Sequence, residues 1–309
     1  MWFRNLMVYR FEDVPEFDPN YDLEKLSEAL ESNRFSHCGP QDAMTIGWTA
    51  PVGDGFEELV HAGSGMILLT ARREERLLPA TVVREALNEK VLEIDNREDR
   101  KVGRKQKMDL KDELIFTLTP RAFTRSTRMM GLIMPKQKLL IIDSASRPRA
   151  EDWISLLRQS LGSLEVTPVE TEQSLSSVFT SWLNGKTPLP PQISLGEECL
   201  LQSPDDSRSK VHCKGQDLNG DEMKSHLDAG KYATRLEVIW NDSLSFVINE
   251  AVEIKRLAFS DTTVEQAYID GVSDQASEFD AAFSLMSLEL ASFLPALWDA
   301  LGGLRSDQA

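Results

Sequence analysis

The sequence is poor in cysteine and histidine and contains no long apolar run. Its three cysteines, Cys38, Cys199 and Cys213, are scattered and unpaired by spacing, so we expect a reducing cytosol rather than a disulfide framework. No apolar run approaches the ~20 residues that cross a bilayer. Residues 1–6 lack the apolar region of a signal peptide. These absences predict a soluble, cytoplasmic protein without a membrane partner.

Recognisable catalytic motifs are absent as well. The four histidines form no pair at zinc-ligand spacing. Gly185-Lys186-Thr187 resembles the end of a phosphate-binding loop, but Thr180 stands where that loop needs a glycine, and Pro188 blocks the helix that should follow. The segment 217–221 has its glycine too early for a calcium loop. We therefore expect no catalytic residue, no metal, no cofactor and no enzymatic activity.

The composition is that of an ordinary globular protein. The chain has 309 residues, of which 41% are hydrophobic and 27% are charged, enough for one large or two medium cores. Strand patterns mostly adjoin other strand patterns, which predicts an α+β fold with mixed or antiparallel sheets, hairpins and amphipathic helices. We expect strands at 3–11, 59–62, 66–72, 128–134, 138–143, 234–240, 244–249 and 254–259. We expect helices at 22–32, 79–94, 110–118, 149–161, 174–184, 220–229 and 277–301.

A proline-rich loop suggests how the chain divides. Pro188, Pro190 and Pro191 follow one another closely, and such clusters mark loops and boundaries. We expect an N-terminal α+β region over 1–187, which includes the basic helix, and a C-terminal α+β region over 188–309, which ends in a long acidic helix.

A basic stretch stands out in this acidic chain. The whole sequence carries a net charge of −16, but residues 97–128 contain ten bases and five acids, a net +5, so the remainder sums to −21. The ten bases are Arg97, Arg100, Lys101, Arg104, Lys105, Lys107, Lys111, Arg121, Arg125 and Arg128. The average surface repels a polyanion, yet this segment can bind one where the fold gathers it in an enclosed place.

The spacing of these bases favours a helix face. Arg100, Arg104, Lys107 and Lys111 recur at intervals typical of one side of a helix, and the helix that begins at Pro79 is expected to run on into them, with an interruption near Gly103. Such a row can follow a phosphate backbone. The alternative, equally weighted on this segment alone, is a solvated face with pairs inside the helix.

Three further groups are ambiguous. Phe123 lies between Arg121 and Arg125, where it can stack on bases or fill the core behind a turn. Arg72 and Arg73 end a strand and read as a solvated turn unless the fold places them beside the basic helix. Lys231, Arg235, Lys255 and Arg256 are strand-associated bases of the same ambiguous kind.

Several ordered segments together resemble one family. They are Trp2-Phe3-Arg4-Asn5-Leu6-Met7-Val8-Tyr9-Arg10, Cys38-Gly39-Pro40-Gln41-Asp42, Gly47-Trp48, the run from Ala71 to Pro79, Leu110-Lys111-Asp112-Glu113, Pro120-Arg121-Ala122-Phe123, the run from Leu156 to Leu164, Gln216-Asp217-Leu218, the run from His226 to Lys231, and Phe279-Asp280-Ala281-Ala282-Phe283. Over essentially the full length, this set resembles the bacterial recombination-associated protein RdgC family.

The resemblance implies a horseshoe-like protomer that forms a ring-shaped homodimer. The ring would encircle double-stranded DNA, and also hold single-stranded DNA, without sequence preference. It would associate with the nucleoid and limit the access of the RecA recombinase to DNA. The DNA-binding residues so implied are Arg72, Arg73, Arg97, Arg100, Lys101, Arg104, Lys105, Lys107, Lys111, Arg121, Phe123, Arg125 and Lys231.

The resemblance also implies a dimer gate at Lys214 and Gln216. Relatives are expected to carry a lysine directly before this glutamine, whereas here Gly215 holds that place and Lys214 lies one residue earlier. Two other classes of function stay open. One is a nucleic-acid-processing enzyme that uses acidic residues and Mg²⁺, and the other is an acidic scaffold that binds another protein.

Overall fold

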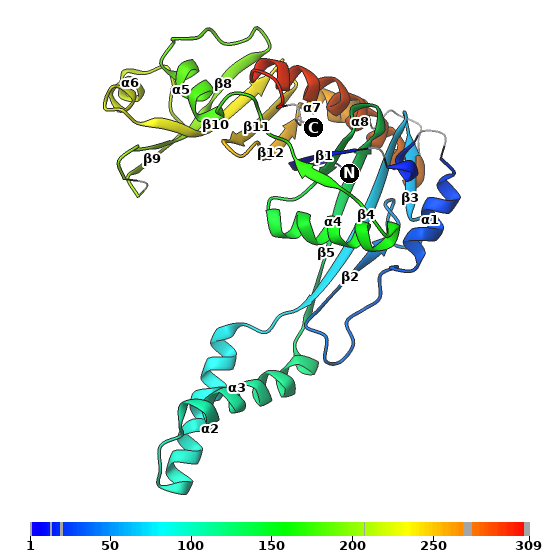
Figure 1. The fold of residues 1–309 in the computed structure, drawn as a ribbon, viewed down its shortest axis with the longest axis vertical. Helices are drawn as coiled ribbons and strands as arrows, with labels where there is room; N and C mark the ends of the chain where they lie inside the picture. Colours follow the sequence, from blue (N-terminus) through cyan, green and yellow to red (C-terminus); the bar gives the residue numbers. More distant parts are fainter. Residues whose placement is uncertain (1, 13, 19–20, 207, 268–273, 306–309) are drawn as a thin grey trace.

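A computed structural model describes residues 2–12, 14–18, 21–206, 208–267 and 274–305 (Figure 1). The strands are β1 (Asn5–Phe11), β2 (Met44–Thr49), β3 (Val60–Gly63), β4 (Met66–Arg76), β5 (Thr124–Met134), β6 (Leu139–Ile142), β7 (Val166–Pro168), β8 (Ile193–Gln202), β9 (Lys210–Lys214), β10 (Tyr232–Trp240), β11 (Leu244–Asn249) and β12 (Ile254–Phe259). The α-helices are α1 (Leu23–Glu31), α2 (Ala80–Glu98), α3 (Arg104–Leu118), α4 (Arg147–Leu161), α5 (Leu175–Leu183), α6 (Asp221–Asp228), α7 (Asp261–Gln266) and α8 (Gln275–Ala300). Short 3₁₀ turns lie at η1 (Pro15–Phe17), η2 (Thr119–Arg121) and η3 (Pro135–Gln137).

The described strands form one open antiparallel sheet. Its order is β2-β4-β5-β6-β1-β12-β11-β10-β8-β9, with β3 added beside β4 and β7 beside β1. Strand β1 joins the two halves, because it pairs with β6 along Met7–Arg10 and with β12 at Asn5 and Leu6. The α+β class and the hairpins expected from the sequence are confirmed. The ribbon curves around one open side, bounded by α2 and α3 at one end and by β9 at the other (Figure 1).

Strand β1 shows why both faces of the sheet are covered. Leu6 and Val8 join one buried cluster, which includes side chains of α5 and α8. Met7, Tyr9 and Phe11 point the other way into a second cluster, which includes side chains of α1 and α4. Because side chains alternate along a strand, a run of apolar residues in β1 supplies both cores.

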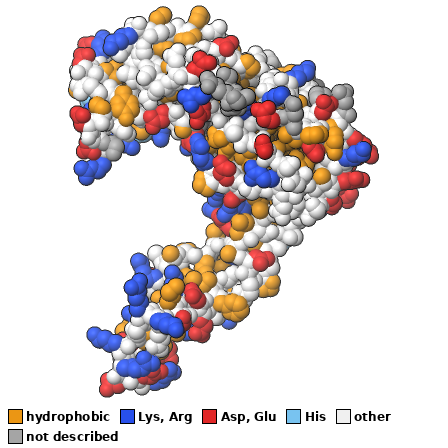
Figure 2. Space-filling model, in the orientation of Figure 1, with side chains coloured by type: hydrophobic (Ala, Val, Ile, Leu, Met, Phe, Trp, Pro, Cys, Tyr) orange, Lys and Arg blue, Asp and Glu red, His pale blue; other side chains and the backbone are white. Residues whose placement is uncertain are grey.

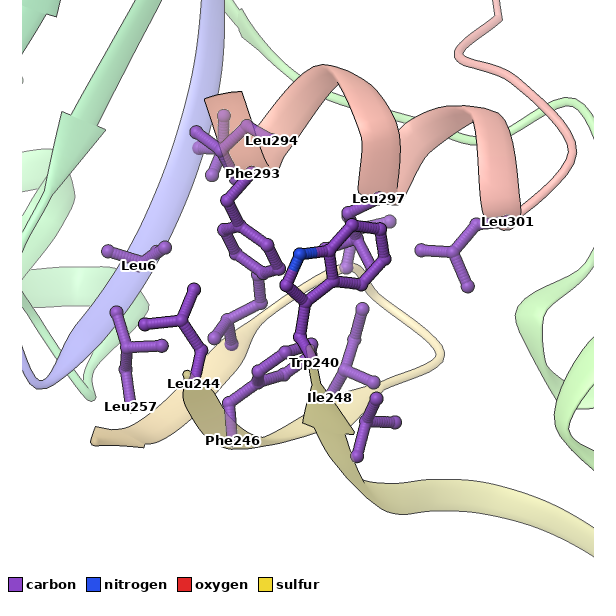
Figure 3. Packing of buried hydrophobic residues seen from close by; sticks show 14 of the residues in the cluster. Leu6, Trp240, Leu244, Phe246, Ile248, Leu257, Phe293, Leu294, Leu297 and Leu301 are labelled. Atoms are coloured by element: carbon purple, nitrogen blue, oxygen red, sulfur yellow. The ribbon is translucent and has the colours of Figure 1, made fainter. Parts of the chain in front are cut away.

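Helix α8 is the main cover of the C-terminal half of the sheet (Figure 3). The Phe293 ring packs edge-on against Trp240, with centroids 5.4 Å apart, and against Phe246 at 5.2 Å. By length and composition this helix is apolar enough to cross a membrane, but half of its apolar window is buried inside the protein. Its apolar stripe, predicted from the sequence, therefore belongs to the core.

The structure corrects several expectations from the sequence. The expected interruption near Gly103 is confirmed, since α2 ends at Glu98, Asp99 adopts a left-handed conformation at φ 48°, and α3 begins after Gly103. The sequence did not show that the two helices fold back on each other at this point. Strand β4 runs on to Arg76, so Arg72 and Arg73 lie in a strand rather than in a turn. Sequence patterns did not predict β2, β7, β8 or β9. The division at 187/188 stays a prediction.

Strand pairing brings together two cysteines that sequence spacing left apart. Cys199 in β8 lies directly opposite Cys213 in β9. Both are buried free cysteines. Sequence spacing did not reveal that these two cysteines are neighbours, because their proximity depends on the pairing of β8 with β9.

A glycine in β5 allows the closest packing in the second core. A Cβ atom at Gly131 would lie 2.3 Å from Cζ2 of Trp153 in α4. Trp153 in turn packs edge-on against Trp48, whose indole N–H donates to Ser160 Oγ at 2.8 Å. Gly131 is thus required by the space that the Trp153 ring occupies.

We predict that Gly131→Ala lowers the free energy of unfolding by about 1–3 kcal/mol, the usual cost of overpacking a core. Urea denaturation of the full chain measures it. In the double variant Gly131→Ala/Trp153→Phe, the smaller ring makes room for the new methyl group, so the combined loss is smaller than the sum of the two single losses. Strict additivity would contradict this account of the contact.

Candidate nucleic-acid interface

Two long strands carry an arm out of the body of the protein. Strands β4 and β5 pair without interruption from Ile67 opposite Ile133 to Arg76 opposite Thr124. Beyond them, α2 and α3 form a helical hairpin that projects along the open side (Figure 1). The bases from Arg97 to Lys111 therefore lie on the hairpin at the end of this arm, whereas Arg125 and Arg128 of the same stretch lie in β5.

The helical hairpin has a thin core. Val83 and Val91 of α2, Val102 of the connecting turn and Leu114 of α3 are buried. Lys90 of α2 adds an ion pair with Glu113 of α3 at 3.2 Å. Other large apolar side chains of the hairpin face outward, namely Val82, Leu92, Met108 and Phe116. The hairpin thus exposes apolar surface as well as charge.

A buried carboxylate fixes the root of the arm. Glu74 of β4 is 4% exposed and accepts hydrogen bonds from the Cys38 backbone N–H at 2.9 Å, His37 Nδ1 at 2.9 Å and Ser126 Oγ at 3.2 Å. These donors, the Cys38 N–H above all, lower the pKa of Glu74 to about 2. The ionised carboxylate ties the segment around Cys38 to both strands of the arm.

Arg76 holds the turn from which the arm's second strand begins. Its Nη1 donates to the Ala122 carbonyl at 3.0 Å and its Nη2 to the Gly39 carbonyl at 3.0 Å. The Leu77 N–H donates to the Phe123 carbonyl at 2.7 Å. Within this braced turn the Phe123 side chain is 85% exposed, so it does not fill the core.

Five bases at the far end of the hairpin are exposed and form no ion pair within the described residues: Lys101, Arg104, Lys105, Lys107 and Lys111. Figure 2 shows Lys and Arg side chains gathered on this part of the molecule, along the edge that borders the open side. Arg121, beside Phe123, is likewise exposed and forms no ion pair in the described part of the chain. These six side chains can neutralise an anionic partner without first breaking a salt bridge.

The structure separates other expected bases from this set. Arg97 and Arg100 both pair with Glu98, at 3.1 and 2.6 Å. Arg100 lies in the turn between α2 and α3. The expected row of four bases on one helix face is therefore reduced to Arg104, Lys107 and Lys111.

Three bases near the root of the arm already have acidic partners. Arg73 pairs with Asp152 at 2.5 Å, and Arg125 pairs with Glu75. Arg72 pairs with Asp54 at 3.5 Å and lies over the Phe35 ring at 4.8 Å. A phosphate would have to displace these acidic partners before it could contact the three arginines. Contacts to the bases at the tip of the arm would not require an ion pair to be broken first.

The remaining expected residues lie at the opposite end of the sheet. Lys214 and Gln216 are exposed in and just after β9, an edge strand in the described sheet. Lys231 Nζ donates to Ser209 Oγ at 3.3 Å. The arm and β9 thus bring basic residues to the two ends of the open side (Figure 2).

Arg235 and Arg256 are strand-associated bases noted in the sequence but not included in the expected DNA-binding set. They lie in β10 and β12. In β10 the buried Leu236 and Val238 alternate with Arg235 and Glu237, so Arg235 points away from the core cluster. Arg256 of β12 reaches Glu198 of β8 at 2.8 Å. The alternation in 234–240 places Arg235 on the face opposite the core cluster.

Metal ligands do not gather around these bases. Across the residues that the structure describes, no group of three or more histidine, cysteine, aspartate or glutamate side chains is arranged to hold a metal ion.

We predict that Glu74→Gln destabilises the protein at neutral pH and that the deficit shrinks in acid. The folded pKa of about 2 lies below the ordinary 4.5, so the stability that ionised Glu74 adds is present above pH 4.5 and is lost as the pH falls toward 2. At pH 7 the expected loss is about 2 kcal/mol, from hydrogen bonds to a charged acceptor. Urea denaturation of both proteins between pH 7 and 3 measures it, and a constant difference would refute the assignment.

Comparison of the sequence with known proteins shows the family to which the chain belongs. A family model described as "Putative exonuclease, RdgC" matches residues 1–304. Proteins named "Recombination-associated protein RdgC" are similar along nearly the whole chain. The one from Pseudomonas aeruginosa (strain PAO1) is 43% identical over 304 residues, 98% of either chain. The one from Pseudomonas fluorescens (strain Pf0-1) is 40% identical over 310 residues, 100% of this chain and 99% of that protein. The chain therefore belongs to the RdgC family of recombination-associated proteins.

Proposed function

We propose that the protein is a non-enzymatic homodimer that encircles duplex DNA without sequence preference. It associates with the nucleoid in the cytoplasm and restrains RecA by occupying the DNA that RecA would use. Single-stranded DNA is a second, weaker substrate of the same cationic surface. The observation that carries the proposal is the group of Lys and Arg side chains at the tip of the arm that form no ion pair with any described residue, in a chain of net charge −16.

The spacing of these bases suits a duplex backbone. Arg104, Lys107 and Lys111 cover seven helical steps, or about 10 Å at 1.5 Å per residue. Duplex DNA presents about six charges over that length of axis. Backbone contacts of this kind fix position but do not read sequence. The acidic remainder of the surface repels DNA elsewhere and so favours one enclosed binding place.

The exposed apolar residues support a dimer. Leu92, Met108 and Phe116 are each more than 60% exposed on a hairpin with few buried residues. Apolar surface of this kind on a soluble protein commonly marks a protein contact. A second copy of the chain is the partner that the proposed ring requires, and a two-fold contact would bury the same residues from both protomers. A second contact at the β9 ends, near Lys214 and Gln216, would close the ring and open for loading.

A nuclease is the second candidate because the matching family model carries the word exonuclease in its description. Incubation of end-labelled duplex with the protein and Mg²⁺ distinguishes the two. The proposed binding protein leaves the duplex intact at protein excess, whereas a nuclease shortens it. An acidic scaffold for another protein would fail to shift DNA at either low or moderate salt.

We predict that replacing three tip bases flattens the salt dependence of duplex binding. For the wild-type protein, log K should fall against log salt by about 0.9 per phosphate neutralised. The triple variant Lys105→Gln/Lys107→Gln/Lys111→Gln should reduce that slope by up to about 2.7, equally on unrelated sequences. Fluorescence anisotropy with random duplexes at several salt concentrations measures it.

Lys90→Gln is the matched control, because Lys90 lies on the same hairpin but already pairs with Glu113. Its slope should equal that of the wild-type protein. A flat wild-type salt response, or a strong preference for one sequence, would refute backbone binding by the arm.

We predict that Phe123→Ala weakens DNA binding without unfolding the protein. Because the ring is 85% exposed, the melting temperature should stay within a few degrees. Loss of stacking should cost about 1–3 kcal/mol of affinity while the salt slope is unchanged. Arg121→Ala, two residues away, should instead reduce the slope by about one unit. A large fall in melting temperature with normal DNA binding would show that Phe123 is structural.

A further inference from the structure

Three sulfur atoms converge where β8, β9 and α6 meet. Cys199 and Cys213 lie directly opposite each other in the antiparallel pair β8–β9. Met223 of α6 packs over them, with its Sδ 3.9 Å from Cys199 Sγ. All three side chains are at most 5% exposed and belong to the larger core cluster. The proposed DNA contacts use none of them.

The spacing of these sulfurs suits a shared metal ion. A sulfur ligand lies about 2.3 Å from a bound metal, so two ligands at 120° around one ion are separated by about 4.0 Å. Cys199 Sγ and Met223 Sδ are 3.9 Å apart. Cross-strand neighbours have Cβ atoms about 4.5–5.5 Å apart, which brings the Cys213 sulfur within reach of the same ion. The third ligand would thus require no change of backbone.

The ligand types select the metal. Two thiols and a thioether are soft donors, which favour Cu(I), whereas Zn²⁺ in structural sites takes four ligands from cysteine, histidine and carboxylate. Metal binding would displace the protons of the two thiols, because cysteine binds a metal as the thiolate.

Two of the three sulfur-bearing residues border a pocket at the protein surface. Cys213 and Met223 line a pocket of about 420 Å³, and the same pocket is lined by Asp217, Asp221 and Glu222. These carboxylates attract positive ions toward the pocket. Met223 lies in the first turn of α6, whose N-terminal end carries partial positive charge. That end helps to offset the net negative charge of two thiolates around a monovalent ion.

We propose that Cys199, Cys213 and Met223 form a binding site for one Cu(I) ion. Two S–H bonds break, two protons leave to solvent, and two thiolate bonds and one thioether bond to copper form, with no change of oxidation state. The ion links β8, β9 and α6, so it rigidifies the end of the sheet that carries Lys214 and Gln216. Binding of copper there is independent of DNA binding by the arm.

The test is an anaerobic titration of the reduced, full-length protein with Cu(I) in competition with bicinchoninate. The wild-type protein should take one equivalent, with three sulfur neighbours at about 2.3 Å by X-ray absorption. Cys199→Ser and Cys213→Ser should each weaken binding at least ~100-fold, and Met223→Leu about tenfold, within the range that loss of a supporting group usually costs a metal site. Cys38→Ser is the control and should bind as the wild-type protein does.

Three results would overturn the proposal. One is equal affinity in the wild-type protein and in the variants of Cys199 and Cys213. Another is loss of binding in Cys38→Ser. The third is recovery of a Cys199–Cys213 disulfide with no copper retained. If circular dichroism shows that the serine variants do not fold, the Met223→Leu variant becomes the decisive test, because this change conserves core volume. The site would be refuted if Met223→Leu bound Cu(I) with the affinity of the wild-type protein and still showed three sulfur neighbours.

Discussion

The buried carboxylate of Glu74 is the constraint on which the position of the arm depends. A lone carboxylate in the interior is costly unless hydrogen bonds compensate it, and here the donors come from the segment around Cys38 and from Ser126 of the facing strand. Two residues along, Arg76 binds carbonyls on both sides of the same junction. The arm therefore leaves the sheet through a junction in which hydrogen bonds of Glu74 and Arg76 link both strands to the segment around Cys38.

The basic residues at the root of the arm differ from those at its tip in whether they form ion pairs. At the root, Arg72, Arg73 and Arg125 form ion pairs with neighbouring carboxylates. These pairs stabilise the strands. At the tip, Lys105, Lys107 and their neighbours have no such partner among the described residues. With a screening length of about 8 Å at physiological salt, only charges at the tip act on a ligand there. The same residue type thus serves structure at one end and, in our proposal, binding at the other.

The sequence predicted those elements whose buried residues form a regular pattern within a single segment. The apolar run in β1 and the stripe of α8 were evident from periodicity, and Pro120 marked the end of α3. The reversal at Asp99 was missed because a helical hairpin and one interrupted helix share the same apolar spacing. The ion pairs of Arg73 and the opposition of Cys199 and Cys213 were out of reach, since both depend on pairing between distant segments. Phe123 could be singled out as a candidate, but its exposure is set by the turn that Arg76 holds.

The thin core of the hairpin links assembly to DNA contact. Few side chains of α2 and α3 are buried, while Leu92, Met108 and Phe116 remain exposed. Helices of this length gain most of their stability from packing an apolar face, so a partner that covers those residues would also hold α3 in place. The bases of α3 lie on that same helix. In the proposed ring, dimer formation would therefore order Arg104, Lys107 and Lys111 before DNA binds. DNA binding would then lose less conformational entropy, because the protein contact has already fixed these side chains in position.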